Sequence, residues 1–224
     1  MSEQATKTLL ILGGTGLVGS KLIEQALADP RVLRVIAPTR RPLTISDHLL
    51  NPLVNFDELP STAPWWKADA VLCALGTTLS QAGSRENFFR VDHDYVLQAA
   101  TLAQKAGTPV FVLNSSMGAE PHSRSFYMRT KGQTENDLEA LGFSSLTHVR
   151  PSLLEGGVRP EFRLGESIGL WFARLLQPLI PPRYRAVHTS DVASTMLAAA
   201  LVPSPGTSVI QSDQIRPQSP GADT

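Results

Sequence analysis

The chain has 224 residues, 20 acidic and 20 basic, with 42% hydrophobic and 18% charged side chains. This composition excludes a disordered chain, and the length suits one domain with a sizeable core. Zero formal net charge disfavours binding of nucleic acid or anionic membranes through bulk charge, and the single cysteine, Cys73, excludes an internal disulfide and gives no metal cluster.

The first predicted unit is a strand, a glycine-rich turn and a helix. Residues 9–12 (LLIL) are an apolar run typical of a buried parallel strand, and residues 21–28 carry apolar side chains at helical spacing. Between them, Gly13 permits a tight turn, Gly16 lets a pyrophosphate approach the backbone, and Gly19 lets the helix pack on the strand. This order predicts a dinucleotide site at the helix N-terminus. The alternative is an ordinary glycine-rich turn.

The second predicted strand, residues 32–37, indicates the choice of cofactor. It ends in Pro38-Thr39-Arg40-Arg41, about 20 residues beyond the glycine turn, where an acidic residue would bind the ribose hydroxyls of NAD. Arginine instead takes a 2′-phosphate in a bidentate fork. We therefore predict NADP(H), and the alternative is a solvated surface pair.

Strands and helices alternate along the next part of the chain. The predicted elements are a short strand at 53–56, a buried strand at 70–75, a loop at 83–90, a helix at about 91–106, a strand at 110–113 with the polar end Asn114-Ser115-Ser116, a helix at 127–141 and a strand at 146–149. Such alternation predicts an α/β, Rossmann-type doubly wound parallel sheet with helices on both faces.

The alternation loosens after Arg150-Pro151. We predict a helix at 166–176, a short strand at 184–187, a last helix at 191–201, an edge strand at 209–210 and a flexible tail at 211–224. Residues 1–210 would form a single nucleotide-binding domain, in which residues 152–188 make most of a small substrate lobe.

Tyr127 and Lys131 lie four residues apart and share one face of the predicted helix. Ser115 and Ser116 lie at a strand end about a dozen residues earlier, beside the expected nicotinamide position. This trio suits carbonyl–alcohol redox chemistry: a phenol gives a proton to a developing alkoxide, a cation lowers the phenol pKa, and a serine hydroxyl polarises the carbonyl. The alternative is an exposed Tyr–Lys pair.

These segments resemble the short-chain dehydrogenase/reductase superfamily in its atypical or extended branch. The resemblance rests on TLLILGGTGLVGS, the YMRTK helix, the SS strand end and VRPSLL. A narrower resemblance, to the Tat-interacting-protein group of NADPH-binding proteins, rests on CALGTTLSQAGSRENFFRVDHDYVLQAATLAQKAG, NSSMGA and YMRTKGQTENDLEALGF. It extends from about Lys7 to Leu201.

The resemblance implies a set of site residues. The pyrophosphate would be lined by Gly13, Thr15, Gly16, Leu17 and Val18, the 2′-phosphate bound by Arg40 and Arg41, the adenosine ribose flanked by Leu75, Gly76 and Thr77, the catalytic trio formed by Ser116 or Ser115 with Tyr127 and Lys131, and the nicotinamide bordered by Pro151 to Leu153. Tyr127 and Lys131 would also contact the cofactor.

One position departs from the pattern of the extended members. They usually carry an asparagine in the helix where this chain has Asp92-His93-Asp94. These three residues could suggest a metal, but adjacent residues on a helix point in different directions, so we predict a solvated face and no metal.

Two functions are compatible with these residues. The first is an NADPH-dependent reductase of a small carbonyl-type substrate. The second is a non-catalytic NADPH-binding regulator or sensor that acts through a protein partner. Residues 1–7 (MSEQATK) contain no apolar signal region, so we expect a cytoplasmic protein without membrane or nucleic-acid partners. The resemblance implies a monomer or a homodimer.

Overall fold

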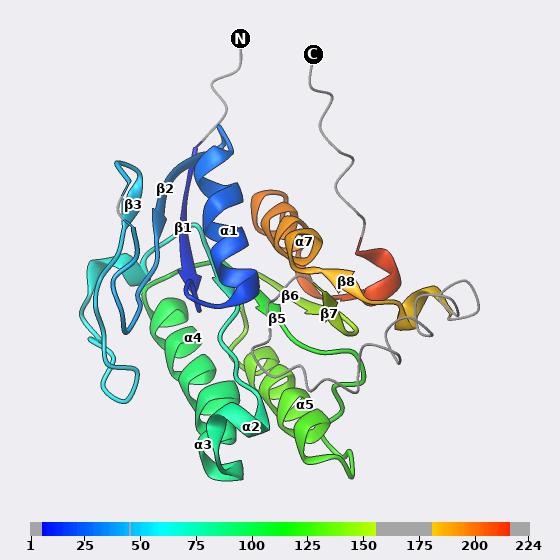
Figure 1. Cartoon of the computed structure of the whole chain (residues 1–224). Helices are drawn as coiled ribbons and strands as arrows, with labels where there is room; N and C mark the ends of the chain where they lie inside the picture. Colours follow the sequence, from blue (N-terminus) through cyan, green and yellow to red (C-terminus); the bar gives the residue numbers. More distant parts are fainter. Residues whose placement is uncertain (1–5, 45, 156–180, 216–224) are drawn as a thin grey trace.

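The computed structural model describes residues 6–44, 46–155 and 181–215. Its centre is a seven-stranded sheet in the order β3-β2-β1-β4-β5-β6-β9, in which every neighbouring pair is parallel (Figure 1). The strands are β1 (Lys7–Leu12), β2 (Val32–Ile36), β3 (Leu49–Leu50), β4 (Ala70–Cys73), β5 (Val110–Asn114), β6 (Ser145–Arg150) and β9 (Gly206–Gln211). A separate parallel pair joins β7 (Leu154–Glu155) to β8 (Val187–His188). The predicted Rossmann-type sheet is confirmed.

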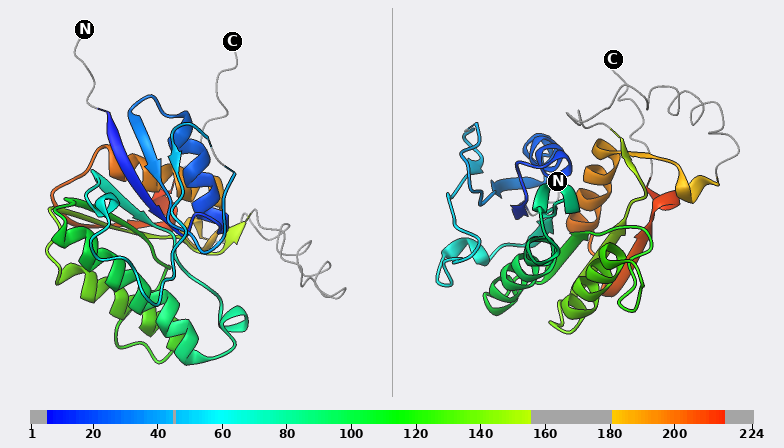
Figure 2. Two further views of the ribbon diagram at one scale, coloured as in Figure 1. Left: turned by 90° about the vertical axis from the view of Figure 1, so that its left-hand side faces the viewer. Right: turned by 60° about the horizontal axis from the view of Figure 1, so that its bottom comes forward.

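Helices cover both faces of this sheet. They are α1 (Leu17–Ala28), α2 (Leu79–Ala82), α3 (Arg85–Phe89), α4 (Tyr95–Lys105), α5 (Phe126–Glu139) and α7 (Thr189–Leu201), with a π-helical turn at Arg90–Asp94 and 3₁₀ turns at Pro64–Trp66, Pro182–Tyr184 and Ser212–Gln214. In Figures 1 and 2, α1 and α7 lie on one face, and α4 and α5 lie on the other.

Alternation along β1 explains the two layers of core. Leu9 and Ile11 pack in the cluster that includes α1 and α7, whereas Leu10 and Leu12 pack in the cluster beneath α4 and α5. Because successive side chains of a strand point to opposite faces, a strand buried on both sides is apolar throughout. All strands run in the same direction, so the segments that follow β1, β4, β5 and β6 meet at one edge of the sheet.

Two predicted elements before residue 91 differ from the structure. The strand that pairs with β2 is Leu49–Leu50, and residues 53–56 contribute only an isolated bridge between Leu53 and Thr39. Pro52 has no N–H for the ladder, which interrupts the regular pairing there. The predicted loop at 83–90 contains α3, whose cap Ser84 accepts a hydrogen bond from Asn87 N.

The C-terminal part is ordered beyond the predicted edge strand. Strand β9 pairs with β6 over six residues, and Ser212 and Ile215 are buried, where we had expected a tail from residue 211. The predicted strand at 184–187 is instead the pair Val187–His188. The predicted helix at 166–176 lies outside the described residues.

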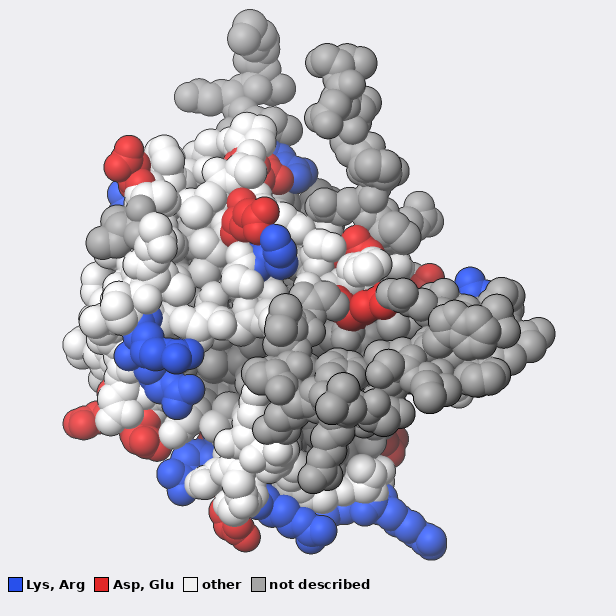
Figure 3. Space-filling model, viewed as in Figure 1, with Lys and Arg blue, Asp and Glu red and all other residues white. Residues whose placement is uncertain are grey.

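The described surface carries charges of both signs. In Figure 3 the basic side chains form several separate groups with acidic side chains between them. Within residues 6–155 and 181–215, apart from residue 45, no helix combines the length and apolar character that crossing a bilayer requires.

Candidate functional site

The glycine turn after β1 is fixed by close packing. Gly13 has φ +84°, and a Cβ there would lie 2.5 Å from the Ala74 carbonyl. A Cβ at Gly19 would lie 2.0 Å from Gly13 O, so α1 and the turn can approach this closely only without that side chain. The predicted roles of these two glycines are therefore matched by the geometry.

The N-terminus of α1 has the features of an anion site. Its cap, Gly16, provides no side-chain hydrogen bond, the first turn contains no acidic residue, and a Cβ at Gly16 would meet only Gly13 O, at 3.3 Å. The free N–H groups and the helix dipole favour a phosphate there. Thr15 and Leu17 are exposed beside this turn, whereas the Val18 side chain is buried in the core and could contribute only its backbone. These residues fit the pyrophosphate of a dinucleotide.

Arg40 and Arg41, called the arginine pair below, follow β2 at the same edge of the sheet. Both are exposed, and neither guanidinium has an ion-pair partner among the described residues. The preceding Thr39 is buried, with 3% exposure. The pair is therefore available for an anion, at the position where the cofactor ribose is expected.

The segment after β4 meets a buried ion pair. Lys131 Nζ lies 2.8 Å from Asp92 Oδ1, and the two side chains are only 7% and 1% exposed. Asp92 Oδ2 accepts a hydrogen bond from Thr77 N at 2.8 Å. A Cβ at Gly76 would be 3.3 Å from Asp92 Oδ1 and 3.7 Å from Lys131 Nζ. The structure thus brings the predicted ribose segment and the predicted catalytic lysine together through Asp92.

Lys131 is held as a cation. Burial by itself lowers the pKa of Lys131, but the Asp92 carboxylate and, to a smaller extent, Tyr127 raise this pKa above its usual value. Tyr127 lies on the same helix, half-buried, with its ring centroid 5.5 Å from that of Phe88. Lys131 therefore provides a fixed positive charge near the Tyr127 phenol.

The two serines after β5 differ in access. Ser115 is buried, its N–H donates to Val149 O at 2.8 Å, and its Oγ has no hydrogen-bond partner among the described residues. Ser116 is half-buried, and its Oγ donates to Met117 O at 3.4 Å. A substrate carbonyl would therefore reach Ser116 more readily than Ser115.

The segment after β6 is tied to the serines. Met117 N donates to Pro151 O at 2.9 Å, so the two strand ends are connected directly. Pro151 is buried, whereas Leu153 is 63% exposed. An exposed leucine at this edge is available to an apolar ring surface, as expected of a residue that borders the nicotinamide.

Asp92 and His93 contradict the predicted solvated face, because both are buried. Both lie in the π-helical turn Arg90–Asp94, where Tyr95 N bonds to Arg90 O, and both have partners on α5: Asp92 pairs with Lys131, and His93 contacts Asp137. Within the part of the chain that the structure describes, no three His, Cys, Asp or Glu side chains gather as a metal site would require. These partners lie about 40 residues away on another helix, so helical periodicity does not predict the burial of Asp92 and His93.

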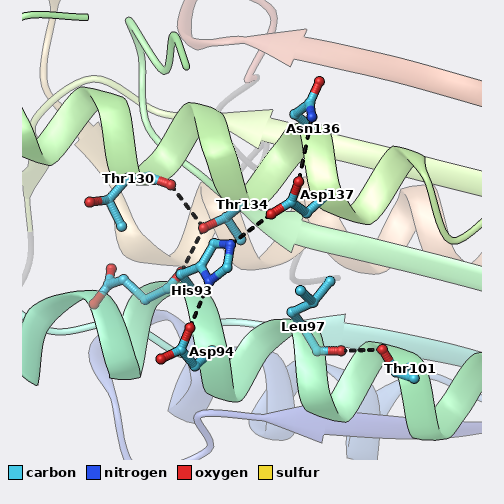
Figure 4. A network of polar contacts seen from close by, with 9 residues as sticks. His93, Asp94, Leu97, Thr101, Thr130, Thr134, Asn136 and Asp137 are labelled. Carbon is cyan, nitrogen blue, oxygen red and sulfur yellow. Dashed lines mark hydrogen bonds and ion pairs between the residues drawn. The ribbon is translucent and has the colours of Figure 1, made fainter. Parts of the chain in front are cut away.

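His93 connects the two helices that flank the ion pair. Figure 4 shows its ring between the turn before α4 and α5, with Nδ1 2.8 Å from Asp94 Oδ1 and Nε2 2.8 Å from Asp137 Oδ2. Beside it, Thr134 Oγ1 donates to a backbone carbonyl, with Asp92 O at 3.0 Å and Thr130 O at 2.9 Å. These contacts hold Asp92 and Lys131 on adjoining helices.

Cys73 ends β4 below this site. The thiol is completely buried, and burial raises its pKa to about 12. A thiol of this kind is not a nucleophile at neutral pH, in agreement with the predicted structural role.

Comparison with known proteins identifies the family. Residues 13–203 match the family model described as NAD(P)H-binding. Protein FMP52, mitochondrial, of Candida albicans is 36% identical over 186 residues, covering 75% of this chain and 80% of that protein. Protein HTATIP2 of Rattus norvegicus is 35% identical over 201 residues, covering 88% and 81%. The solved structure of MoeE5 in complex with UDP-glucose and NAD matches with a TM-score of 0.68 at 20% identity, covering 90% and 74%, which shows a shared fold.

The relatives also correct one prediction. We expected a cytoplasmic protein, but the FMP52 relatives from Candida albicans and Emericella nidulans carry the description mitochondrial, so that expectation is wrong. The residues that match the family model include the glycine turn from Gly13 on and the Tyr–Lys helix, and the parallel sheet agrees with the fold of the solved structure. The chain belongs to the NAD(P)H-binding family of short-chain dehydrogenase/reductase-like proteins, as an atypical member that resembles the HTATIP2 subfamily.

Proposed function

We propose that the protein is an NADP(H)-dependent oxidoreductase that transfers hydride to a small carbonyl-type substrate. The observation that carries this proposal is the buried Lys131 cation, 2.8 Å from Asp92, one helical turn from Tyr127 and beside the segment after β4. A buried charge is costly, and burial of a lysine with one specific partner in a nucleotide-binding fold favours a functional role.

The residues of the chain would divide the work as follows. NADPH, when bound, would supply a hydride from a nicotinamide C–H bond to the carbonyl carbon and would be left as NADP⁺. The Tyr127 phenol donates a proton to the carbonyl oxygen, so the product is an alcohol. Lys131 stabilises the tyrosinate that remains, and Ser116 donates a hydrogen bond to the same oxygen as negative charge develops there. Solvent then returns the proton to Tyr127.

The arginine pair supports NADP(H) over NAD(H). Two exposed guanidiniums without a partner among the described residues provide several parallel N–H donors for a phosphate. Removing both charges, in Arg40→Ala/Arg41→Ala, should weaken NADPH binding and leave NADH binding nearly unchanged. Each charge-assisted hydrogen bond contributes roughly 1.5–3 kcal/mol, so we expect the NADPH Kd to rise at least tenfold. Titration followed by nicotinamide fluorescence measures both constants. An unchanged NADPH/NADH ratio would contradict the proposed preference.

A second candidate is a cofactor-binding regulator without turnover. Asp92 favours it, because its carboxylate offsets part of the Lys131 charge and so reduces the effect of that charge on Tyr127. Tyr127→Phe separates the two functions. NADPH oxidation by aldehydes, ketones and quinones should fall about 10²-fold or more while NADPH binding persists. If the wild-type protein binds NADPH but oxidises it with none of these compounds, the regulator is the better assignment.

A further inference from the structure

One side chain makes hydrogen bonds to the chain on both sides of the arginine pair. Asn51 follows β3 and is half-buried. Its Nδ2 donates to Ala37 O at 2.6 Å and to Thr39 Oγ1 at 2.8 Å, before the pair, and its Oδ1 accepts from Leu43 N at 2.8 Å, after the pair. One amide therefore closes the loop of residues 37–43.

The partners determine how this amide is oriented. The Leu43 N–H can only donate, so it requires the oxygen of the amide, and the Ala37 carbonyl can only accept, so it requires the nitrogen. The Thr39 hydroxyl uses the second N–H of the same nitrogen. An aspartate or a leucine of similar size would leave at least one of these groups without a partner.

Asn51 also supplies a hydrogen bond that is missing from the parallel ladder beyond β2. Beyond β2, Thr39 N donates to Pro52 O, and Val54 N donates to Thr39 O, each at 3.0 Å. By the spacing of a parallel ladder, Ala37 O should accept from the residue at 52, which is a proline without an N–H. The Asn51 side chain supplies that missing donor.

The bond to Thr39 continues to the arginine pair itself. Thr39 Oγ1 accepts from Asn51 and donates to Arg41 O at 2.6 Å. A chain of two hydrogen bonds thus runs from the sheet to the backbone of the second arginine, and successive bonds of this kind strengthen each other. At the far end, Leu43 packs against the core, and a Cβ built on Gly14 would lie 3.6 Å from its Cδ1.

We infer that Asn51 is a positioning residue for recognition of the cofactor 2′-phosphate, because it holds the backbone of the arginine pair against the glycine turn. The inference rests on the proposed preference for NADP(H). A flexible loop must be ordered when a phosphate binds, which reduces affinity, whereas a loop that is ordered in advance avoids this cost. NADH has no 2′-phosphate and makes no use of the pair, so loosening the loop should affect only NADPH.

The test is the ratio of the two dissociation constants in Asn51→Ala. Asn51→Ala removes three hydrogen bonds from the loop, and ordering a freed side chain again when the phosphate binds costs roughly 1 kcal/mol, so we expect the NADPH Kd to rise about fivefold, with the NADH Kd within about twofold of wild type. Adenosine 2′,5′-bisphosphate and AMP, used as displacing ligands, should show the same contrast. Asn136→Ala, an exposed asparagine on α5, is the matched control and should change neither constant.

Thr39→Val keeps the shape of the side chain but breaks the bond to Arg41, so it tests the same path if Asn51→Ala folds poorly. Thr39→Val should raise the NADPH Kd and leave the NADH Kd unchanged. The double variant Thr39→Val/Asn51→Ala should bind NADPH no more weakly than Asn51→Ala does, since both substitutions act through one chain of hydrogen bonds.

Equal weakening of NADPH and NADH binding would overturn the inference and leave Asn51 a purely structural residue. If Arg40→Ala/Arg41→Ala changes the ratio and neither of these variants does, the inference fails while the cofactor preference stands. If Arg40→Ala/Arg41→Ala also leaves the NADPH/NADH ratio unchanged, the inference about Asn51 and the proposed preference for NADP(H) both fail.

Discussion

At the scale of single residues, Asp92 is the partner that makes a buried lysine tolerable. The pair is almost completely removed from solvent, and the second carboxylate oxygen is occupied by Thr77 N. A buried ion pair stabilises little compared with an apolar replacement, but removing one partner leaves an uncompensated charge. In the proposed reductase, the pair would therefore hold a cation near Tyr127 more than it would stabilise the fold.

Replacing one residue of the Asp92–Lys131 pair should lower the free energy of unfolding more than replacing both residues does. Asp92→Leu leaves Lys131 buried without its partner, and we expect the free energy of unfolding to fall by about 3–5 kcal/mol. Lys131→Met leaves the Asp92 carboxylate unpaired and should cost a similar amount, whereas Asp92→Leu/Lys131→Met should recover a large part of the loss. Urea denaturation of the four proteins gives the coupling energy. Additive losses in the double variant would show that the two charges do not stabilise each other.

The sequence revealed half of this pair. The spacing of Tyr127 and Lys131 indicated the lysine, because four residues are about one helical turn. Asp92 stands where the extended members usually carry an asparagine, but its burial depends on Lys131 and Thr77, which lie far from it in the sequence, so local pattern predicts a solvated face. Asn51 gave no signal at all, because its role depends on a missing N–H at Pro52.

At the scale of elements, the serine segment is held in place by a glycine of α5. A Cβ at Gly132 would lie 2.3 Å from both Glu120 C and Pro121 N, so the segment after Ser116 passes directly over the helix backbone. Glu120 N donates to Met128 O at 3.2 Å in the same crossing. The helix that carries Tyr127 and Lys131 thereby also determines where the serines lie.

Gly132→Ala should therefore have an effect opposite to helix propensity. Alanine favours a helix over glycine by roughly 1 kcal/mol, but the Cβ would displace the backbone at Glu120 and Pro121, and overpacking of this kind costs roughly 1–3 kcal/mol. We expect lower stability and lower turnover from displaced serines. Gln133→Ala, the next position on α5, is the control and should leave stability within about 0.5 kcal/mol of wild type. An increase in thermal stability of Gly132→Ala would contradict the predicted clash.

Elements were predictable where local pattern and tertiary packing agree. The apolar strands β1 and β4 and the helix α7 follow from short-range periodicity. The position of the third strand was not predictable in this way. Leu53 is apolar but 62% exposed, and the residues that pair with β2 are Leu49–Leu50. The short helices α2 and α3 depend on the N-caps Thr78 and Ser84, and a single capping residue is only a weak sequence signal for a helix.

At the scale of the whole molecule, the sheet buries a titratable group away from the proposed site. His148 on β6 is completely buried, and its Nε2 lies 3.5 Å from Glu139 Oε1 under α5. Burial lowers the pKa of His148; Glu135 and Glu139 oppose this shift, and Arg150, which is bonded to Glu135, adds to it. The folded protein therefore keeps this imidazole neutral where the unfolded chain would protonate it.

This lowered pKa makes stability fall in acid. The unfolded chain binds a proton near pH 6.5, whereas the folded protein binds it only at lower pH, so the stabilising contribution is complete above about pH 6.5 and is lost as the pH decreases toward the folded pKa. His148→Leu removes this titration. The difference in free energy of unfolding between wild type and this variant should therefore be constant from about pH 8 to pH 7. Toward about pH 5.5, wild type should lose stability relative to the variant. His122→Gln, at an exposed histidine, should follow wild type throughout. Urea denaturation across this range measures the effect, and a difference that does not change with pH would show that His148 does not couple protonation to folding.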